Sequence, residues 1–538
     1  MKRMTYFVMA LALVLGLAQC KKEKLETPQN EGNSVMITLD VKGDNNAKVD
    51  VDPPHVTFEK DDEIVVACNG HYVGTLTYDY DYENNEGTFS GYIENATPGE
   101  HLYFYFFGNV SPQYFDTHKN ECTVYIGDQT GDLPVISMGQ SKETVPSDPS
   151  ERSNYTAILQ NKCSLMKFNA DINSTAPLCI SGMNNFVTVR FNRSGDDGFI
   201  DGFKYSKVYN GVIKMAGLTT GNTETWAIVL PQEGPIAAGN AYTEDYGYIG
   251  TRPAIAGGIG INQYYSDGVT MTMESFDPLA IPLTFEAKTA GVMVSLDRAG
   301  DDDENAPNVY LQTSTDGDIW TTYTIGDYIT LAKEGDKVMF RATTTNIRFA
   351  KSPAACHTFS IDEGYCYVYG NIMSLLNKNN YATLDELSAL DEYIFESLFA
   401  GCTGLCDHPQ KPLELPATGL ADYCYSHMFL GCSNLFVAPK LPARELTEGC
   451  YQGMFEGTGL EESPVLPAAT LVSNCYASMF SRCTSLNRVT CLATSGMGDN
   501  TTGWLSNVAA RGTFIKSSYA TSWTTGPNGI PDGWAIEQ

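Results

Sequence analysis

The sequence has few basic residues for its length. Its 34 Lys and Arg residues stand against 64 Asp and Glu residues among 538, which gives a formal net charge of −30 at pH 7. A protein this acidic is repelled by the phosphates of nucleic acids and by anionic lipid headgroups. We therefore expect no nucleic-acid partner, and we expect a solvated acidic surface.

Motifs for catalysis and metal binding are also lacking. The seven histidines are scattered and form no metal-ligand pair on a helix. There is no Gly-x-Ser-x-Gly, no phosphate-binding loop and no Gly-x-Gly-x-x-Gly motif. The acidic run from Asp301 to Glu304 lacks the alternating ligands and central glycine of a calcium loop. We predict that the protein is not an enzyme and uses no metal or other cofactor, although a pair of carboxylates brought together by the fold stays open.

Long hydrophobic runs are confined to the N-terminus. Lys2-Arg3 precede an apolar stretch from Phe7 to Ala18, which is shorter than the roughly 20 residues of a transmembrane helix. This pattern is typical of an export signal. The stretch ends in Leu-Ala-Gln-Cys at Cys20, which resembles a bacterial lipobox with Gln where Gly or Ala is usual. The resemblance implies removal of residues 1–19 and lipidation of Cys20, so we expect the membrane to be a partner through this lipid alone.

Residues 20–34 are polar and read as a flexible tether. Lipoproteins exported to the surface of Gram-negative anaerobes often carry an acidic stretch directly after the cysteine. Here that stretch is the mixed Lys-Lys-Glu-Lys. We expect a lipid-anchored protein of the outer membrane at the cell surface, and the choice between inner and outer leaflet stays open.

Alternating polar and apolar residues, separated by Gly, Asn and Asp turns, indicate short β-strands as far as residue 371. We predict three blocks of strands, each a β-sandwich, at residues 35–139, 155–277 and 278–371. A Ser- and Pro-rich linker is predicted from Gly139 to Ser153. In "YDYDYENNEG", the tyrosines at 78, 80 and 82 share one strand face, which we expect to pack on a core more readily than to bind sugar.

Parts of the first two blocks resemble fimbrillin-like proteins. The resemblance rests on "TFEKDDEIVV", "KCSLMKFN" and "ETWAIVLPQ", and it covers about residues 35–275. It implies two transthyretin-like sandwiches in a pilus subunit or a related surface lipoprotein. The chain has no convincing basic trimming site of the kind that stalk subunits use to expose a strand-exchange groove.

The final block repeats itself. Cys-Tyr recurs at 424, 450 and 475, spacings of 26 and 25 residues, and Leu-Pro-Ala recurs at 415–417, 441–443 and 466–468. "CDHPQKP" lengthens the first unit. A fixed period of this length predicts a solenoid, because one unit cannot bury its own apolar face. We expect each unit to contain a short strand, a turn at Pro-Ala and a helical turn at Cys-Tyr-x-x-Met-Phe.

The spacing Phe-x-x-Cys-x-x-Leu within these units resembles the BspA-type leucine-rich repeat over about residues 385–492. The resemblance implies a bacterial surface protein that adheres to host proteins, other cells or glycans. Residues 493–538 depart from the repeat, and we expect their Trp504, Phe514, Trp523 and Trp534 to cap the solenoid. The predicted fold is thus mainly β: tandem β-sandwich domains followed by a short leucine-rich-repeat solenoid with a C-terminal cap.

Ten of the fifteen cysteines lie between residues 356 and 491. Zinc sites use cysteines about two to four residues apart, and only Cys402 and Cys406 come near that spacing. Export permits disulfides. Cysteines one repeat apart would however stack in register, where a small buried thiol packs as a hydrophobic residue. We favour buried thiols and keep disulfides and a metal site as alternatives.

These observations predict a surface binding or adhesion protein that displays the solenoid on a β-sandwich stalk. Candidate binding residues are the variable positions Lys440, Arg444 and Glu445 of the repeat. Possible partners are a host protein, a glycan or a pilus subunit. The alternatives are an accessory or tip subunit of a fimbrillin-type pilus, and a glycan-capture lipoprotein of a nutrient-uptake system.

Overall fold

The structure is a computed structural model that describes residues 34–537, apart from 42–57, 59, 82–85, 109–113, 117–120, 131–132, 134–135, 152, 192–199, 205–210, 220 and 389. The described residues form β-strands, turns and six short 3-10 helices (Pro149–Glu151, Pro278–Ala280, Asp303–Asn305, Ile372–Leu375, Tyr381–Thr383 and Asp499–Thr501). No described helix has the length and apolar character needed to cross a membrane. The mainly β fold predicted from sequence is confirmed.

Eight strands near the N-terminus form one sheet that closes on itself. Their spatial order is β10-β1-β4-β3-β2-β5-β9-β11, and β10 also pairs with β9. Their bounds are Ser34–Val41 (β1), Glu63–Cys68 (β2), His71–Asp81 (β3), Glu86–Glu94 (β4), His101–Phe106 (β5), Ser137–Thr144 (β9), Asn154–Ala157 (β10) and Gln160–Asn161 (β11). Tyr78 packs against Phe89 in the core of this sheet, as predicted, while the side chains of residues 80 and 82 lie outside the described residues.

The linker predicted from Gly139 to Ser153 is wrong for its first part, because Ser137–Thr144 form β9 and pair with β5. Ser141 is buried there. Its hydroxyl accepts a hydrogen bond from the Leu102 amide at 3.0 Å and donates one to the Glu143 carbonyl at 2.6 Å. Buried polar groups are tolerated when they are hydrogen-bonded, so this polar sequence forms a strand.

The first sheet shares a core with the sheets that follow. Val66 and Phe104 face its own core, whereas Val65 and Tyr105, their neighbours in β2 and β5, face a second one. Strands buried on both faces are apolar along their length, which explains "EIVVAC" in β2. Residues 121–129 belong to the later sheets, so the sheets cross the boundary that the sequence placed between 139 and 155.

Three sheets make up the second region. Their strand orders are β17-β12-β20, β21-β19-β18-β13-β16-β8 and β15-β14-β7-β6. The bounds are Tyr114–Asp116 (β6), Glu121–Tyr125 (β7), Asp128–Gln129 (β8), Ser164–Asn169 (β12), Leu178–Ile180 (β13), Phe186–Arg190 (β14), Ile200–Lys204 (β15), Ile213–Met215 (β16), Glu224–Val229 (β17), Gly239–Thr243 (β18), Tyr248–Arg252 (β19), Tyr264–Thr270 (β20) and Thr272–Ser275 (β21).

The third block has two sheets, ordered β25-β24-β27-β22-β30-β31 and β26-β23-β29-β28, which pack around one core. The bounds are Leu283–Ala287 (β22), Val292–Ala299 (β23), Leu311–Ser314 (β24), Thr321–Tyr323 (β25), Ile329–Leu331 (β26), Lys337–Ala342 (β27), Ala350–Ser352 (β28), Ala355–Asp362 (β29), Cys366–Asn371 (β30), Leu405–Asp407 (β31) and Leu413–Glu414 (β32). Both β31 and β32 belong to the first repeat unit and pair in parallel with β30. The repeats therefore continue a sheet of the third block.

The repeats form a stack of coils, which we call the coil stack. Each coil contributes one rung, at residues 393–401, 423–431, 449–457, 474–482 and 500–506. Alternate residues of a rung donate their amide to the next coil, as Phe399 does to Met428 and Phe429 to Met454, both at 2.9 Å. Residues between them donate to the carbonyl three positions earlier. A single hydrophobic core runs from Leu283 through the stack to Trp534.

The helical turn predicted at Cys-Tyr-x-x-Met-Phe is wrong. Half of the amides in each rung are used between coils, so they are not available for helical bonds to the residue four positions earlier. Instead φ is positive about every fourth residue, at Tyr393, Ser397, Gly401, Tyr423, His427, Gly431, Gly449, Gly453, Gly457, Asn474, Ser478, Arg482, Gly503 and Asn507. Each rung is therefore a run of linked turns.

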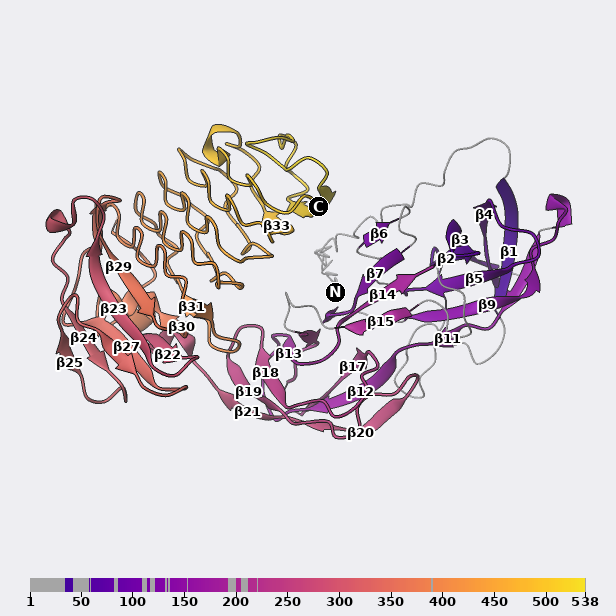
Figure 1. Cartoon of the computed structure of the whole chain (residues 1–538), viewed down its shortest axis with the longest axis horizontal. Coiled ribbons are helices and arrows are strands. Elements are labelled where there is room, and N and C mark those ends of the chain that lie inside the picture. The colour runs from indigo at the N-terminus through magenta and orange to yellow at the C-terminus, as the bar shows by residue number, and fades with distance from the viewer. Residues whose placement is uncertain are drawn as a thin grey trace, which may run out of the picture.

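The tail departs from the repeat in sequence but continues the stack. Strands Arg488–Cys491 (β33), Thr513–Lys516 (β34) and Ala535–Glu537 (β35) pair in parallel. Trp504 is fully buried, stacks on Tyr476 with ring centroids 6.2 Å apart, and donates its indole N–H to Gly529. The four predicted capping residues belong to or pack against the core of these last coils. Figure 1 shows the closed first sheet at one end of the molecule, and the third block, from which the stack rises, at the other.

Candidate binding surfaces

Aromatic rings align the coils. The rings of Phe399, Phe429, Phe455 and Phe480 stack in series, 5.5, 5.6 and 5.7 Å apart and within 7° of parallel. Tyr425 stacks on Tyr451 in a second column, at 5.9 Å. Because these side chains are buried and parallel, side chains on the outside of successive coils are held in fixed register. The stack therefore offers a regular, rigid surface.

The cysteines of the stack pack inside it. Thirteen cysteines in the described part of the chain are buried free thiols. Burial raises the pKa of the Cys424 thiol to about 12, which leaves it protonated and unreactive. No group of three or more possible metal ligands occurs in the described part of the chain. This arrangement matches the packing interpretation.

The thiol of Phe-x-x-Cys has a further role that sequence reasoning missed. Cys432 donates to the carbonyl of Phe399 in the preceding coil at 3.0 Å, and Cys483 donates to Phe455 at 2.9 Å. In the copy that carries Thr458 instead, the hydroxyl donates to Phe455 of its own coil at 2.8 Å, and it lies 3.2 Å from the Cys483 thiol of the next coil. In these three copies the position therefore holds a small side chain that donates a hydrogen bond, a property that Cys and Thr share.

The three predicted binding residues have different surroundings. Arg444 and Glu445 are exposed, and neither makes a side-chain hydrogen bond or ion pair with another described residue. Lys440 is exposed but contacts the second region: its Nζ lies 3.3 Å from the Glu244 carbonyl oxygen and 5.7 Å from the ring centre of Tyr246. The binding role of these residues stays a prediction.

The insert "CDHPQKP" of the first unit joins the stack to its neighbours. The Gln410 amide donates to the carbonyls of Ala241 at 3.1 Å and Gly250 at 2.5 Å, in β18 and β19. Lys411 pairs with Glu286 of β22 at 3.3 Å. The sequence showed that residues had been inserted here, but it carried no signal that they form a junction between blocks.

His408 in the same insert is held neutral. Its Nδ1 accepts from the amides of Gln410 and Lys411, both at 3.0 Å. Burial, and then the nearby charge of Lys411, lower the pKa of His408 to about 4. Burial opposes ionisation of Glu286 next to it, but the hydrogen bond from Tyr369 and the charge of Lys411 outweigh burial and lower the pKa of Glu286. The junction is therefore stabilised by the neutral His408 and by the ion pair of Lys411 with Glu286.

A buried acid lies on the first rung. The Glu396 side chain is fully buried, and its Oε1 lies 3.1 Å from Nδ1 of His427, whose side chain is 24% exposed. Its Oε2 has no hydrogen-bond partner among the described residues. The hydrogen bond to Glu396 is the main cause that raises the pKa of His427. A carboxylate removed from water in this way depends on the imidazolium for stabilisation.

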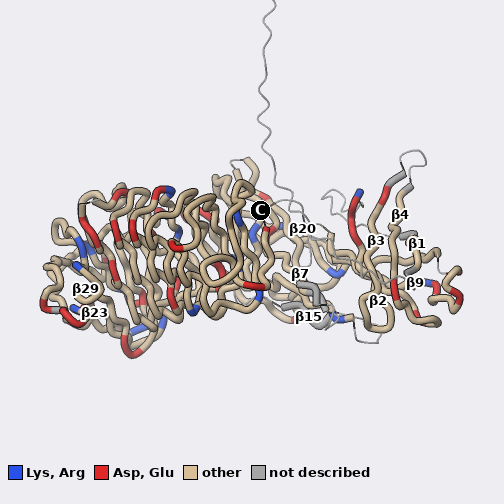
Figure 2. Tube along the Cα trace, turned by 90° about the horizontal axis from the view of Figure 1, so that it is seen from above, with Lys and Arg blue, Asp and Glu red and all other residues tan. Residues whose placement is uncertain are grey.

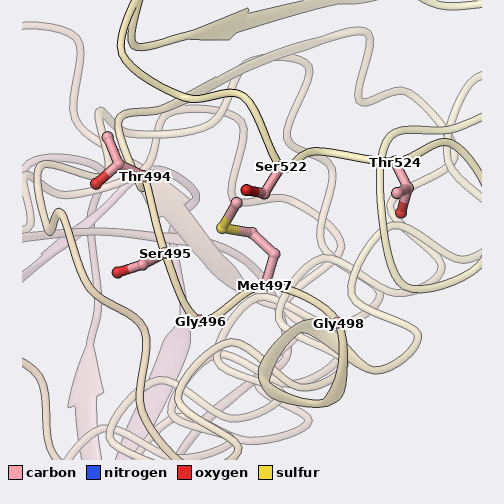
Figure 3. A pocket seen from close by; sticks show the side chains of 7 residues that line it. All are labelled: Thr494, Ser495, Gly496, Met497, Gly498, Ser522 and Thr524. Atoms are coloured by element: carbon pink, nitrogen blue, oxygen red, sulfur yellow. The ribbon is translucent and has the colours of Figure 1, made fainter.

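The C-terminal coils enclose a hollow of about 370 Å³ (Figure 3). It is lined by Thr494, Ser495, Gly496, Met497, Gly498, Ser522 and Thr524. The hydroxyl hydrogens of Thr494 and Ser495 are already donated within the chain, to Ala469 and Thr470. Trp523 between the lining residues turns inward, against Trp504 at 5.4 Å. The hollow has neither a charged nor an aromatic group to hold a ligand, so we assign no site there.

Comparisons with known proteins give little help. No protein-family model matches the chain, and a comparison with curated proteins finds no match. Solved structures of proposed cell adhesion proteins from Bacteroides uniformis, Bacteroides ovatus and Bacteroides eggerthii are weakly similar. They share 16%, 13% and 12% identity, cover 46% of this chain and 99%, 99% and 97% of their own, and have TM-scores of 0.26, 0.24 and 0.24. Scores this low establish no common fold.

Proposed function

We propose that the protein is a lipid-anchored cell-surface binding or adhesion protein, in which β-sandwich domains display a leucine-rich-repeat solenoid. One observation carries the proposal: the phenylalanine rings of successive coils stack with their centroids 5.5–5.7 Å apart, over one core from Leu283 to Trp534. Extended surfaces of stacked repeats are well suited to binding macromolecules. The coil period of 25 or 26 residues and the parallel pairing at β30–β31 support the solenoid assignment.

The anchor and the location are proposed from sequence. Cys20 lies outside the described residues. Protease shaving of intact cells tests surface display, with lysed cells and a periplasmic marker as controls. We expect cleavage in intact cells, and loss of the protein from the membrane fraction in the variant Cys20→Ala. A chain that resists protease in intact cells but is cut after lysis would overturn surface display.

Binding is tested with the purified mature chain, residues 20–538, on arrays of glycans and host matrix proteins. The variant Arg444→Ala/Glu445→Ala removes the two exposed candidate residues of the stack. Its matched control is Lys333→Ala/Glu334→Ala, which removes a similar exposed pair from the third block. We expect the first variant to weaken binding and the second to leave it unchanged. Equal binding by all three proteins would show that Arg444 and Glu445 are not part of the binding surface.

A further inference from the structure

The hairpin formed by β24 and β25 carries a second surface, away from the coil stack. Figure 1 places these strands at the outer edge of the third block, at the opposite end of the molecule from β1 and β4. The loop between them, residues 315–320, is ordered by one side chain. Asp316 accepts from the amides of Asp318 and Ile319, both at 2.9 Å, and from the Ser314 hydroxyl at 2.9 Å. The loop thus has a fixed shape despite its exposure.

This loop holds Trp320 over Arg341 of the adjacent strand β27. The indole N–H donates to the Gly317 carbonyl at 2.8 Å, which fixes the ring. The guanidinium carbon of Arg341 lies 3.8 Å from the ring centre, which is van der Waals contact with its face. A guanidinium stacked in this way keeps its N–H groups at its edge, where they can bind a planar acceptor.

Arg341 has no partner for its charge. It makes no ion pair and no side-chain hydrogen bond within the described part of the chain, and its buried Nε is unsatisfied. Burial lowers the pKa of Arg341, as expected for a cation that has lost part of its hydration. In a protein with 64 acidic and 34 basic residues, carboxylates to pair with an arginine are plentiful. A half-buried, stacked and unpaired arginine is therefore a candidate ligand-binding group.

Two polar side chains continue the surface across the sheet. Gln312 of β24 is the direct cross-strand neighbour of Arg341, and Thr322 of β25 is the neighbour of Gln312. Directly opposed residues point to the same face of a sheet. The Gln312 Oε1 is buried and has no hydrogen-bond partner in the part of the chain that the structure describes. An unsatisfied donor at Arg341 and an unsatisfied acceptor at Gln312 thus lie side by side.

We propose that Trp320, Arg341, Gln312 and Thr322 bind a carboxylate-bearing saccharide. The guanidinium would take the carboxylate as a bidentate pair, which is the geometry that arginine matches best. The Gln312 amide and the Thr322 hydroxyl would bind ring hydroxyls, and the exposed part of Trp320 would contact the apolar face of the sugar. Because the net charge is −30, the ligand is a short acidic sugar or an acidic chain end, and a long polyanion would be repelled.

The inference goes beyond the proposed display of the coil stack and is tested separately. The probe is tri-galacturonic acid, compared with its methyl ester, which has the same rings without the charges. Calorimetric titration of the mature chain, residues 20–538, is expected to show binding of the acid at least about tenfold tighter than of the ester. Arg341→Gln should abolish this preference. Arg341→Lys keeps the positive charge but loses the planar guanidinium, so it should retain only part of the preference for the acid.

The control is Arg298→Gln, which removes the same charge from an exposed arginine of β23, in the other sheet. It should bind as the parent does. Trp320→Leu should weaken both acid and ester, and thermal melts of every variant show whether the fold is intact. Three outcomes would overturn the proposal: equal affinity for acid and ester, no binding at 10 mM probe, or equal losses in Arg341→Gln and Arg298→Gln. These outcomes are independent of the two tests of the proposed function, which are protease shaving and the Arg444→Ala/Glu445→Ala variant.

Discussion

The stability of the coil stack should depend on the pH through Glu396 and His427. The histidine is the sole cation within hydrogen-bond distance of the buried carboxylate among the described residues, at 3.1 Å. The other hydrogen bond to Oε1 comes from the neutral Ser397 hydroxyl at 3.2 Å. When His427 loses its proton, the buried Glu396 side chain loses its charged partner. We therefore expect the stack to be more stable at mildly acidic than at alkaline pH.

The sign follows from the pKa of His427. Its pKa is raised above 6.5 in the folded chain, first by the hydrogen bond to Glu396 and also by the charges of Glu396 and Glu456. The stabilisation is thus fully present below about pH 6.5 and is lost as the pH rises through the folded-state pKa. Glu456 itself pairs with Arg482 at 3.1 Å, so its charge is partly offset. His408, with a pKa lowered to about 4, acts in the opposite direction, but only below pH 6.5.

Loss of one partner from a buried ion pair costs about 3–5 kcal/mol, and the exposure of His427 places this pair at about 3 kcal/mol. The core from Leu283 to Trp534 spans about 250 residues, for which each 1 kcal/mol shifts the Tm by about 2–4 °C. His427→Gln should therefore lower the Tm at pH 6 by about 6–12 °C. Glu396→Gln, which removes the acidic group itself, should cost less and should flatten the pH dependence.

Differential scanning calorimetry of the three proteins between pH 5.5 and 8.5 measures these effects. The parent should lose stability above pH 6.5, and both variants should show a flatter profile there. Because His408 and the other histidines are present in every protein, the difference between parent and variant isolates His427. A His427→Gln variant with the same slope as the parent between pH 6.5 and 8.5 would refute the reasoning.

Three further predictions concern the packing of the stack and its junction. Gly453→Ala should lower the free energy of unfolding by about 2 kcal/mol or more, because φ is +59° and the new Cβ would lie 2.5 Å from the His427 ring. Gly401→Ala should cost about 1 kcal/mol, because φ is +76° but the space around the new Cβ is open. Denaturant melts of the two variants compare these costs. The described thiols, such as Cys424, should not react with Ellman's reagent in the native chain and should react after unfolding. Rapid labelling of the stack cysteines in the native chain would contradict their burial. Gln410→Ala should remove two hydrogen bonds between the stack and β18–β19 and lower the free energy of unfolding by about 1–3 kcal/mol. Limited proteolysis near the junction should then be faster. Unchanged cleavage would show that the junction does not depend on Gln410.

The repeat could be predicted well because its cause is local and repeated. A buried ring that recurs every 25 or 26 residues is expected to stack on its counterpart in the next coil, so the period of Cys-Tyr and Met-Phe already predicts coils with buried thiols between them. The conformation of each rung could not be predicted in this way. A helical turn and the observed linked turns would bury the same residues of a rung. The two conformations differ in their hydrogen bonds, and only the linked turns use half of the amides to bond the next coil.

The linker and the tail show the limits of reading composition. The segment around Ser141 is polar, yet it is a strand because β5 satisfies its hydroxyl and its backbone. The tail lacks the repeat signature, yet β34 and β35 extend the stack because parallel pairing depends on backbone groups that every residue has.

The sequence by itself determined the mainly β composition, the coil period and the excess of acidic residues, which Figure 2 shows distributed along the chain. These properties follow from residue type and from spacing along the chain. Only the tertiary structure decided that Lys440 contacts Tyr246, that Glu396 is buried against His427, and that Arg341 lies unpaired beneath Trp320. Each of these contacts joins residues at least 21 positions apart, and no motif in the sequence predicts that the two residues meet. Their charges and rings acquire a role only when strands and coils bring them within a few ångströms and exclude water.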